Sequence, residues 1–83
     1  MLNLQRVTMF IAVVDAGSFT LAAAALGQTK AVVSFNVRQL ENELGVTLLL
    51  RSTRRLRLTD AGVLLYQRGV ALLNAAENLQ DEV

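Results

Sequence analysis

Cysteine and histidine are both missing from this 83-residue sequence, and each absence excludes a kind of chemistry. Without cysteine the chain has neither disulfides nor thiolate metal ligands, which is compatible with an intracellular location. Without histidine it also lacks the side chain that enzymes use most often as a general base. We therefore expect neither a catalytic site nor a bound metal or cofactor.

An enzyme built on this chain would depend on side chains that carry oxygen, of which the candidates are Ser18, Ser34, Asp15, Glu41 and Glu43. The three acids are divided between two predicted helices, and no glycine-rich loop for a phosphate group accompanies them. An enzymatic function is thus the least favoured interpretation.

Long hydrophobic runs are missing as well. The longest, such as residues 9–14, are far shorter than the about 20 residues that a membrane-spanning helix needs. A cleavable signal peptide is an alternative for residues 6–17, but the residues after it continue a helical pattern. We expect a cytoplasmic protein without membrane association.

The charges that are present are unevenly placed, although the net charge is only +1. Residues 1–58 hold seven of the eight basic side chains and three acidic ones, hence +4, whereas residues 59–83 hold one basic and four acidic side chains, hence −3. The first part is therefore expected to face a polyanion. The chain is also 53% hydrophobic, more than so small a domain needs, which favours a partner surface.

Cap residues divide the first half of the chain into three predicted helices. Asn3 caps a first helix that Gly17 ends, and its apolar face is formed by Leu4, Val7, Phe10, Ile11 and Val14. Ser18 caps a short helix over residues 19–26, a turn follows at Gly27, and Thr29 caps a longer helix that Gly45 ends. A short helix, a tight turn and a longer helix are the helix-turn-helix pattern, here over residues 18–37.

The longer helix has two unlike faces. At about 100° per residue, one face is an apolar stripe made of Val33, Val37, Leu40 and Leu44. The other face carries Ala31, Ser34, Phe35, Arg38 and Asn42. Water alone does not favour a phenyl ring on such a face, whereas the major groove of DNA provides apolar groups for it.

A small hairpin is predicted next, with a strand over residues 46–50, a turn over residues 52–55 and a return strand over residues 56–58. Half of the basic residues fall in this hairpin, without any acid among them: Arg51, Arg54, Arg55 and Arg57. A charged turn is often merely solvated, but its place beside a helix-turn-helix favours phosphate contacts.

Thr59 caps a last helix, Asp60 suits its positive N-terminal end, and about 24 residues extend it to the C-terminus. Gly62 is expected to weaken its first turn slightly. Large and small residues alternate at intervals of seven, which predicts a dimer interface made of Leu65, Gly69, Leu72, Leu73, Ala76 and Leu79. The alternative is a helix that folds onto its own domain.

Many of these positions together resemble the N-terminal winged helix-turn-helix domain of LysR-type transcriptional regulators. The resemblance covers residues 2–62 and is carried by Val14, Ala16, Gly17, Ser18, Phe19, Thr20, Ala22, Ala23, Leu26, Val33, Ser34, Val37, Arg38, Leu40, Glu41, Leu44, Gly45, Leu48, Arg51, Arg54, Arg55, Leu58, Thr59, Ala61 and Gly62. Residues 63–83 resemble the family's linker helix.

The resemblance implies a mainly α fold, with three helices and a two-stranded wing, in a bacterial transcription factor that binds double-stranded DNA as a homodimer or tetramer. It divides the chain into a DNA-binding domain over residues 1–58, with its wing at about 46–58, and a linker or dimerisation helix over residues 59–83. It also implies that a small-molecule effector acts only through a C-terminal domain that is absent here, so we expect a DNA-binding fragment.

The sequence departs from the family pattern where the family faces the bases. The family often has Ser-Gln-Ser or Thr-Gln-Ser at residues 29–31, and Arg or a polar residue at Phe35. It usually has Phe at Leu49 and a polar residue at Leu50, so the wing of this chain is more apolar.

In this fold the second helix of the motif enters the major groove and the first crosses the backbone. Lys30, Ala31, Ser34 and Phe35 are therefore predicted to face base edges, and Arg38 a phosphate. The remaining predicted DNA contacts lie at the start of the first motif helix and in the wing, at Ser18, Thr20, Arg51, Thr53, Arg54 and Arg55. Ser18 also serves as a cap, and Arg51 has an alternative role in bracing the wing. The alternative function is a protein-interaction or dimerisation module with only non-specific DNA affinity.

Overall fold

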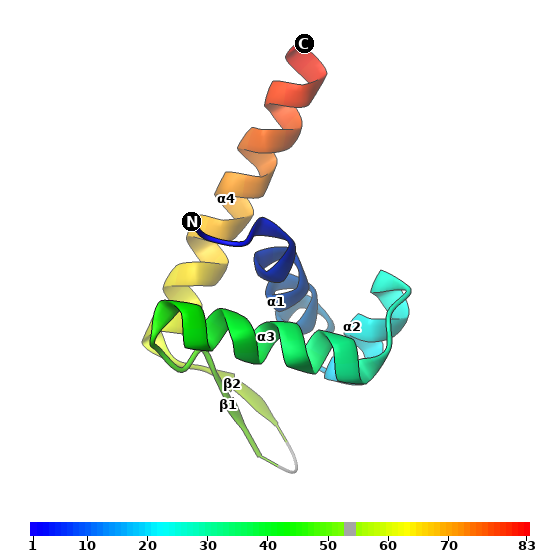
Figure 1. Ribbon diagram of the computed structural model, residues 1–83, viewed down its shortest axis with the longest axis vertical. Coiled ribbons are helices and arrows are strands. Elements are labelled where there is room, and N and C mark those ends of the chain that lie inside the picture. The colour runs from blue at the N-terminus through cyan, green and yellow to red at the C-terminus, as the bar shows by residue number, and fades with distance from the viewer. Residues whose placement is uncertain (53–54) are drawn as a thin grey trace.

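The computed structural model describes residues 1–52 and 55–83. In chain order its elements are α1 (Leu4–Ala16), α2 (Phe19–Leu26), α3 (Lys30–Leu44), β1 (Leu49–Arg51), β2 (Leu56–Leu58) and α4 (Asp60–Glu82). Helices α1 to α3 pack together, the hairpin projects beyond them, and α4 extends away on the other side (Figure 1). This order of three helices, a hairpin and a long helix is the predicted one. Thr53 and Arg54, two of the predicted DNA contacts, lie outside the described residues.

Every predicted helix boundary with a cap is confirmed. The side-chain oxygens of Asn3, Ser18, Thr29 and Thr59 each accept the backbone N–H three residues further on. Gly17, Gly27 and Gly45 have φ angles of 72°, 67° and 68°, the left-handed conformation that ends a helix. These local interactions fix the short connections of the helix-turn-helix.

A single apolar core lies between the helices and the base of the hairpin, and its largest fully buried side chains are Phe10, Leu40, Leu48, Val7, Val13, Val33 and Val37. The predicted stripe of α3 is confirmed at three positions, but Leu44 is 41% exposed. In α1, Leu4 is exposed while Met9 and Val13 are buried instead. Helix α1 contacts α2, α3 and α4, so its buried surface extends beyond the predicted face, whereas Leu44 is the last residue of α3.

The hairpin differs from its prediction at its start. Its antiparallel register pairs Leu49 with Leu58 and Arg51 with Leu56, so the first strand begins at Leu49 rather than at residue 46. The Thr59 N–H donates to the Leu48 carbonyl at 3.0 Å, which continues the antiparallel register by one pair. The Leu48 N–H donates instead to the Glu41 carboxylate at 2.8 Å, so the regular pairing ends there.

Helix α4 begins inside the domain and leaves it, and its first turn corrects the expectation for Gly62. A Cβ atom at Gly62 would collide with the carbonyl oxygen of Leu48 and lie 3.1 Å from the carbonyl carbon. Glycine is thus required at Gly62 for the close approach of α4 to the chain before the hairpin, and it is not simply a weak point.

Some residues of the predicted dimer interface pack against the domain, and others are exposed to solvent. The open side of Gly69 faces Val7 and Ile11 of α1, to which a Cβ would come within 3.1 and 3.2 Å, and its place in a dimer interface stays a prediction. Leu65 and Leu73 pack partly against the same core. The predicted interface residues that stay exposed are Leu72, Ala76 and Leu79. The first half of α4 therefore folds onto its own domain, while the division of the chain at residue 58 stays a prediction.

A further contact fixes α4 against α1. The Tyr66 hydroxyl donates a hydrogen bond to the Asp15 carboxylate, and this bond raises the pKa of the Tyr66 phenol. None of the helices in the described part of the chain combines the length and apolar character needed to cross a membrane.

Candidate nucleic-acid interface

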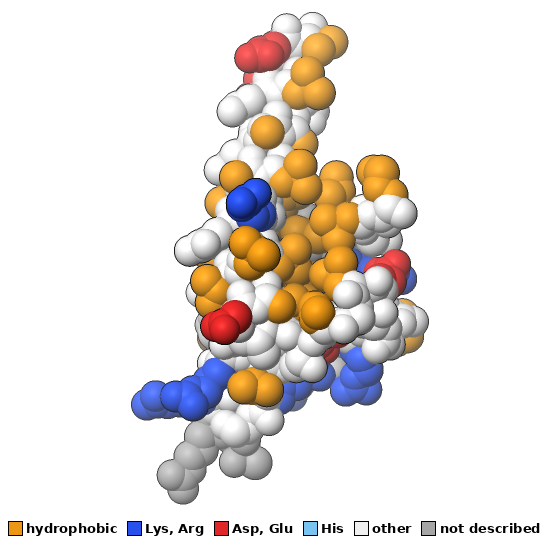
Figure 2. All heavy atoms as spheres, turned by 90° about the vertical axis from the view of Figure 1, so that its left-hand side faces the viewer, with side chains coloured by type: hydrophobic (Ala, Val, Ile, Leu, Met, Phe, Trp, Pro, Cys, Tyr) orange, Lys and Arg blue, Asp and Glu red, His pale blue; other side chains and the backbone are white. Residues whose placement is uncertain are grey.

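Basic side chains concentrate at the hairpin end of the molecule. On the face shown in Figure 2, most Lys and Arg side chains gather near the hairpin, while acidic side chains lie both at the far end of α4 and in the lower half of the molecule. Arg6 does not belong to this group, although it lies in the basic part of the sequence. Its guanidinium donates to Asn36 Oδ1 at 3.2 Å and to Glu43 Oε1 at 2.8 Å, so it joins α1 to α3.

A recess of about 260 Å³ brings together predicted contacts from three elements. It is lined by the start of α2, the start of α3 and the hairpin, through Gly17, Ser18, Phe19, Thr20, Lys30, Ser52, Arg55 and Leu56. The first turn of a helix directs N–H groups outward and carries a partial positive charge. Two cations, hydroxyl groups and a helix N-terminus thus surround a space of suitable chemistry for one phosphate group.

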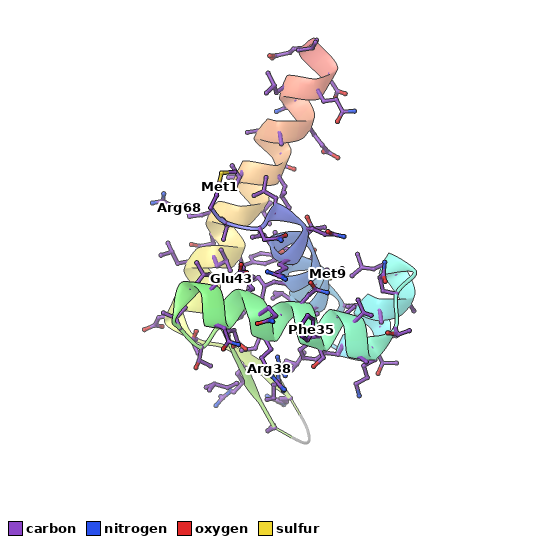
Figure 3. The ribbon with its side chains drawn as sticks, in the orientation of Figure 1. Met1, Met9, Phe35, Arg38, Glu43 and Arg68 are labelled. Carbon is purple, nitrogen blue, oxygen red and sulfur yellow. The ribbon has the colours of Figure 1, made fainter. Side chains whose placement is uncertain are left out.

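The outer face of α3 continues from this recess. Ala31, Phe35 and Arg38 are exposed, and Ser34 is half-buried. Figure 3 shows Phe35 on α3 and Arg38 further along the helix, towards the hairpin. Arg38 also lines a groove of about 520 Å³ between α3 and β1. The predicted base-facing and phosphate-facing residues thus lie on one helix, whose first residue, Lys30, lines the recess and whose Arg38 lines the groove.

Arg51 occupies a bracing position. The central carbon of its guanidinium lies 4.6 Å from the centroid of the Phe19 ring, and one nitrogen lies 3.8 Å from Glu41 Oε1. These contacts tie the hairpin to α2 and α3, which is the alternative role predicted for Arg51. A DNA contact by Arg51 stays a prediction.

Glu41 positions the hairpin, and the sequence analysis missed this role. Its Oε2 accepts the N–H groups of Leu48 at 2.8 Å and Leu49 at 3.3 Å. The carboxylate side chain is 16% exposed. A signal existed, because Glu41 follows the buried Leu40 and precedes a strand whose first amide groups need acceptors.

Replacement of Glu41 by Ala is expected to lower the free energy of unfolding by about 2 kcal/mol, since two largely buried N–H groups lose their acceptor. Glu41→Gln should cost less, because its carbonyl oxygen can still accept. Urea unfolding followed by circular dichroism measures both. Glu43→Ala is the control, since the exposed Arg6–Glu43 pair should contribute no more than about 1 kcal/mol. Equal losses for Glu41→Ala and Glu43→Ala would contradict the positioning role.

Comparison with known proteins identifies the family. Residues 4–63 match the family described as "Bacterial regulatory helix-turn-helix protein, lysR family". The chain belongs to the lysR family. This lysR-family chain is 51% identical over 70 residues to "HTH-type transcriptional regulator PtxR" of Pseudomonas aeruginosa, a match that covers 84% of the chain and 22% of PtxR. The chain spans about a quarter or less of the length of the first such relatives.

Solved structures confirm the winged helix-turn-helix fold of this lysR-family chain. The BenM_DBD chain in its complex with benA site 1 DNA matches with a TM-score of 0.93 and 34% identity, over 96% of this chain and 90% of that one. Full-length CbnR complexed with its target DNA matches with a TM-score of 0.90 and 32% identity, over 96% of this chain and 28% of that one.

Proposed function

We propose that this lysR-family domain binds double-stranded DNA sequence-specifically and thereby serves transcription regulation. The observation that carries the proposal is the recess in which Lys30, Arg55 and the N-terminus of α2 converge, directly beside the exposed face of α3. DNA complexes among its structural relatives support it. The names of its relatives as transcriptional regulators support a role without catalysis.

The geometry suggests how the domain docks. A phosphate in the recess fixes the register of the domain on the duplex, since backbone contacts position a protein and base contacts give specificity. The N-terminal half of α3 then lies in the major groove, where Lys30, Ala31, Ser34 and Phe35 meet base edges. Arg38 contacts a second phosphate, and the hairpin that carries Arg55 follows the backbone towards the neighbouring minor groove, where negative potential favours arginine.

We further propose that two copies act together through α4. Leu72 and Leu79 are 43% and 62% exposed, and Leu64 is 56% exposed beside an apolar recess of about 390 Å³. Apolar surface of this kind is expected to be covered by a partner. A homodimer recognises a pseudo-palindromic operator, whose half-sites are spaced by whole helical turns. For the complete regulator we also propose tetramers, effector binding through another domain and a cytoplasmic location.

Selection from random duplexes tests binding, spacing and symmetry together. The 83-residue chain should enrich duplexes that contain a two-fold symmetric pair of half-sites. The competing function, a protein-interaction module, is favoured by the same exposed apolar residues. Recovery of unenriched sequences, or of no duplex even at low salt, would support that module and overturn specific DNA binding.

A further inference from the structure

The first two turns of α3 present an unusually apolar surface for a helix that meets DNA. Phe35 is 57% exposed and Val32 is 38% exposed, and Ala31 beside them is exposed as well. Phe35 does not belong to the residues packed against the core cluster. Its ring is thus available to a ligand on the surface that Figure 3 shows between the start of α3 and Arg38.

The polar side chain best suited to recognise a purine is engaged elsewhere. Asn36 donates its Nδ2 to the Val32 carbonyl at 2.8 Å and accepts from Arg6 Nε at 3.2 Å. Residues 30–37 all lie in the described part of the chain, and they contain no other amide and no guanidinium. A bidentate hydrogen bond to adenine is therefore unavailable from this segment, and Lys30 is left to donate to guanine O6 and N7. Apart from Asn36, Ser34 supplies the one other side-chain hydrogen-bonding group of the segment.

A phenyl ring discriminates between base edges because it cannot replace the hydrogen bonds that polar base groups make with water. Against guanine N7 and O6, adenine N6 or cytosine N4 it leaves a polar group without water or a partner, which is unfavourable. Thymine places its C5-methyl group in the same region of the major groove, and 5-methylcytosine places a methyl group there too. Contact between the ring and such a methyl group buries apolar surface on both sides.

We propose that Phe35 recognises the 5-methyl group of a pyrimidine in each half-site, so that the domain senses methylation as well as base identity at that position. This inference rests on the proposed DNA-binding function. Burial of one methyl group changes affinity about fourfold. A symmetric dimer with one such contact per half-site should therefore discriminate by about fifteenfold when both methyl groups are removed.

Uracil substitution isolates the methyl group, because deoxyuridine keeps every hydrogen-bonding group of thymidine and lacks only that methyl. The probe is a duplex enriched by the 83-residue chain from a random library. Thymidines in its half-sites are replaced one symmetric pair at a time, and affinity is measured by fluorescence anisotropy. We expect one pair whose replacement weakens binding about fifteenfold. At that pair a duplex with 5-methylcytosine should bind about fifteenfold more tightly than the same duplex with cytosine, because the two differ only in the methyl group.

Variant chains assign the effect to the ring. Phe35→Ala should bind the thymidine and deoxyuridine duplexes equally at the sensitive pair. Leu21→Ala is the matched control, because Leu21 is exposed to a similar degree at 60% on α2 and is not among the residues proposed to contact DNA or the second copy, and it should keep the full discrimination. The ratio of two affinities is compared within each variant, so a general change in stability cancels.

The outcomes separate this inference from the function on which it rests. A wild-type chain that selects a sequence but tolerates uracil at every position overturns methyl recognition and leaves specific DNA binding intact. Discrimination that persists in Phe35→Ala overturns the role of Phe35, because another residue then contacts the methyl group. A chain that selects no sequence at all overturns both.

Discussion

The Gly62→Ala chain is expected to lose about 2 kcal/mol or more of its free energy of unfolding. The added Cβ would collide with the Leu48 carbonyl oxygen, and that oxygen is held in place by hydrogen bonds from the Thr59 N–H at 3.0 Å and hydroxyl at 3.3 Å. Backbone cannot rotate away as a side chain can, so α4 has to shift. The higher helix propensity of alanine, worth about 1 kcal/mol, offsets only part of this cost.

Gly69→Ala is the matched control for this prediction. It makes the same substitution in the same helix, but the added Cβ meets the ends of Val7 and Ile11 side chains at 3.1 and 3.2 Å. Side chains can move by a few tenths of an ångström, so the gain in helix propensity should nearly cancel the crowding. Urea unfolding of the two variants should therefore differ clearly. Equal stability would show that the approach of α4 to Leu48 is not a tight constraint.

Local signals explain why so much of the fold could be predicted from the sequence. A capping oxygen and the N–H that it satisfies are three residues apart, and a left-handed glycine ends a helix through its own backbone angles. The caps at Ser18 and Thr29 and the stop at Gly27 therefore define the helix-turn-helix without reference to the rest of the chain. The stripe of Val33, Val37 and Leu40 is equally local, since helical periodicity alone places these residues together.

Contacts between distant segments account for what the sequence did not predict. Gly62 is needed because of Leu48, and Gly69 faces α1, and neither partner is visible from the glycine itself. Glutamate is a good helix former, so its presence at residue 41 of α3 needs no special explanation. Its role as a hydrogen-bond acceptor depends on where the next strand begins. The pairing of Arg6 with Asn36 and Glu43 is of the same kind.

The candidate site was predicted as a set of residue types, and its arrangement required the fold. Charge counting attributes equal weight to Arg6, Lys30, Arg51 and Arg55. In the structure Arg6 and Arg51 make contacts within the domain, whereas Lys30 and Arg55 line one recess. Electrostatic attraction to DNA should therefore depend on position in the fold and not on net charge alone.

Removal of Lys30 and Arg55 together is expected to make DNA binding much less sensitive to salt. Each phosphate that a cation neutralises adds about 0.9 to the slope of log K against log salt. The recess that Lys30 and Arg55 share takes one phosphate, so the double variant Lys30→Ala with Arg55→Ala removes two such contacts from a dimer, and the slope should fall by about 1.8. Between 50 and 200 mM salt the wild type should thus lose roughly twelvefold more affinity than the variant.

Arg68→Ala is the control that separates a contact from a change in net charge. Arg68 lies on α4, beside the apolar recess that it shares with Leu64 and away from the hairpin, and its removal changes net charge by the same amount as Arg55→Ala. Fluorescence anisotropy titrations with one duplex at several salt concentrations give the slope for each chain. Arg55→Ala should lower it by at most about 1.8 per dimer, because Lys30 remains at the same recess, and Arg68→Ala should leave it unchanged. If both lowered the slope equally, cations would act through the overall charge of the domain, and the recess would not be a phosphate site.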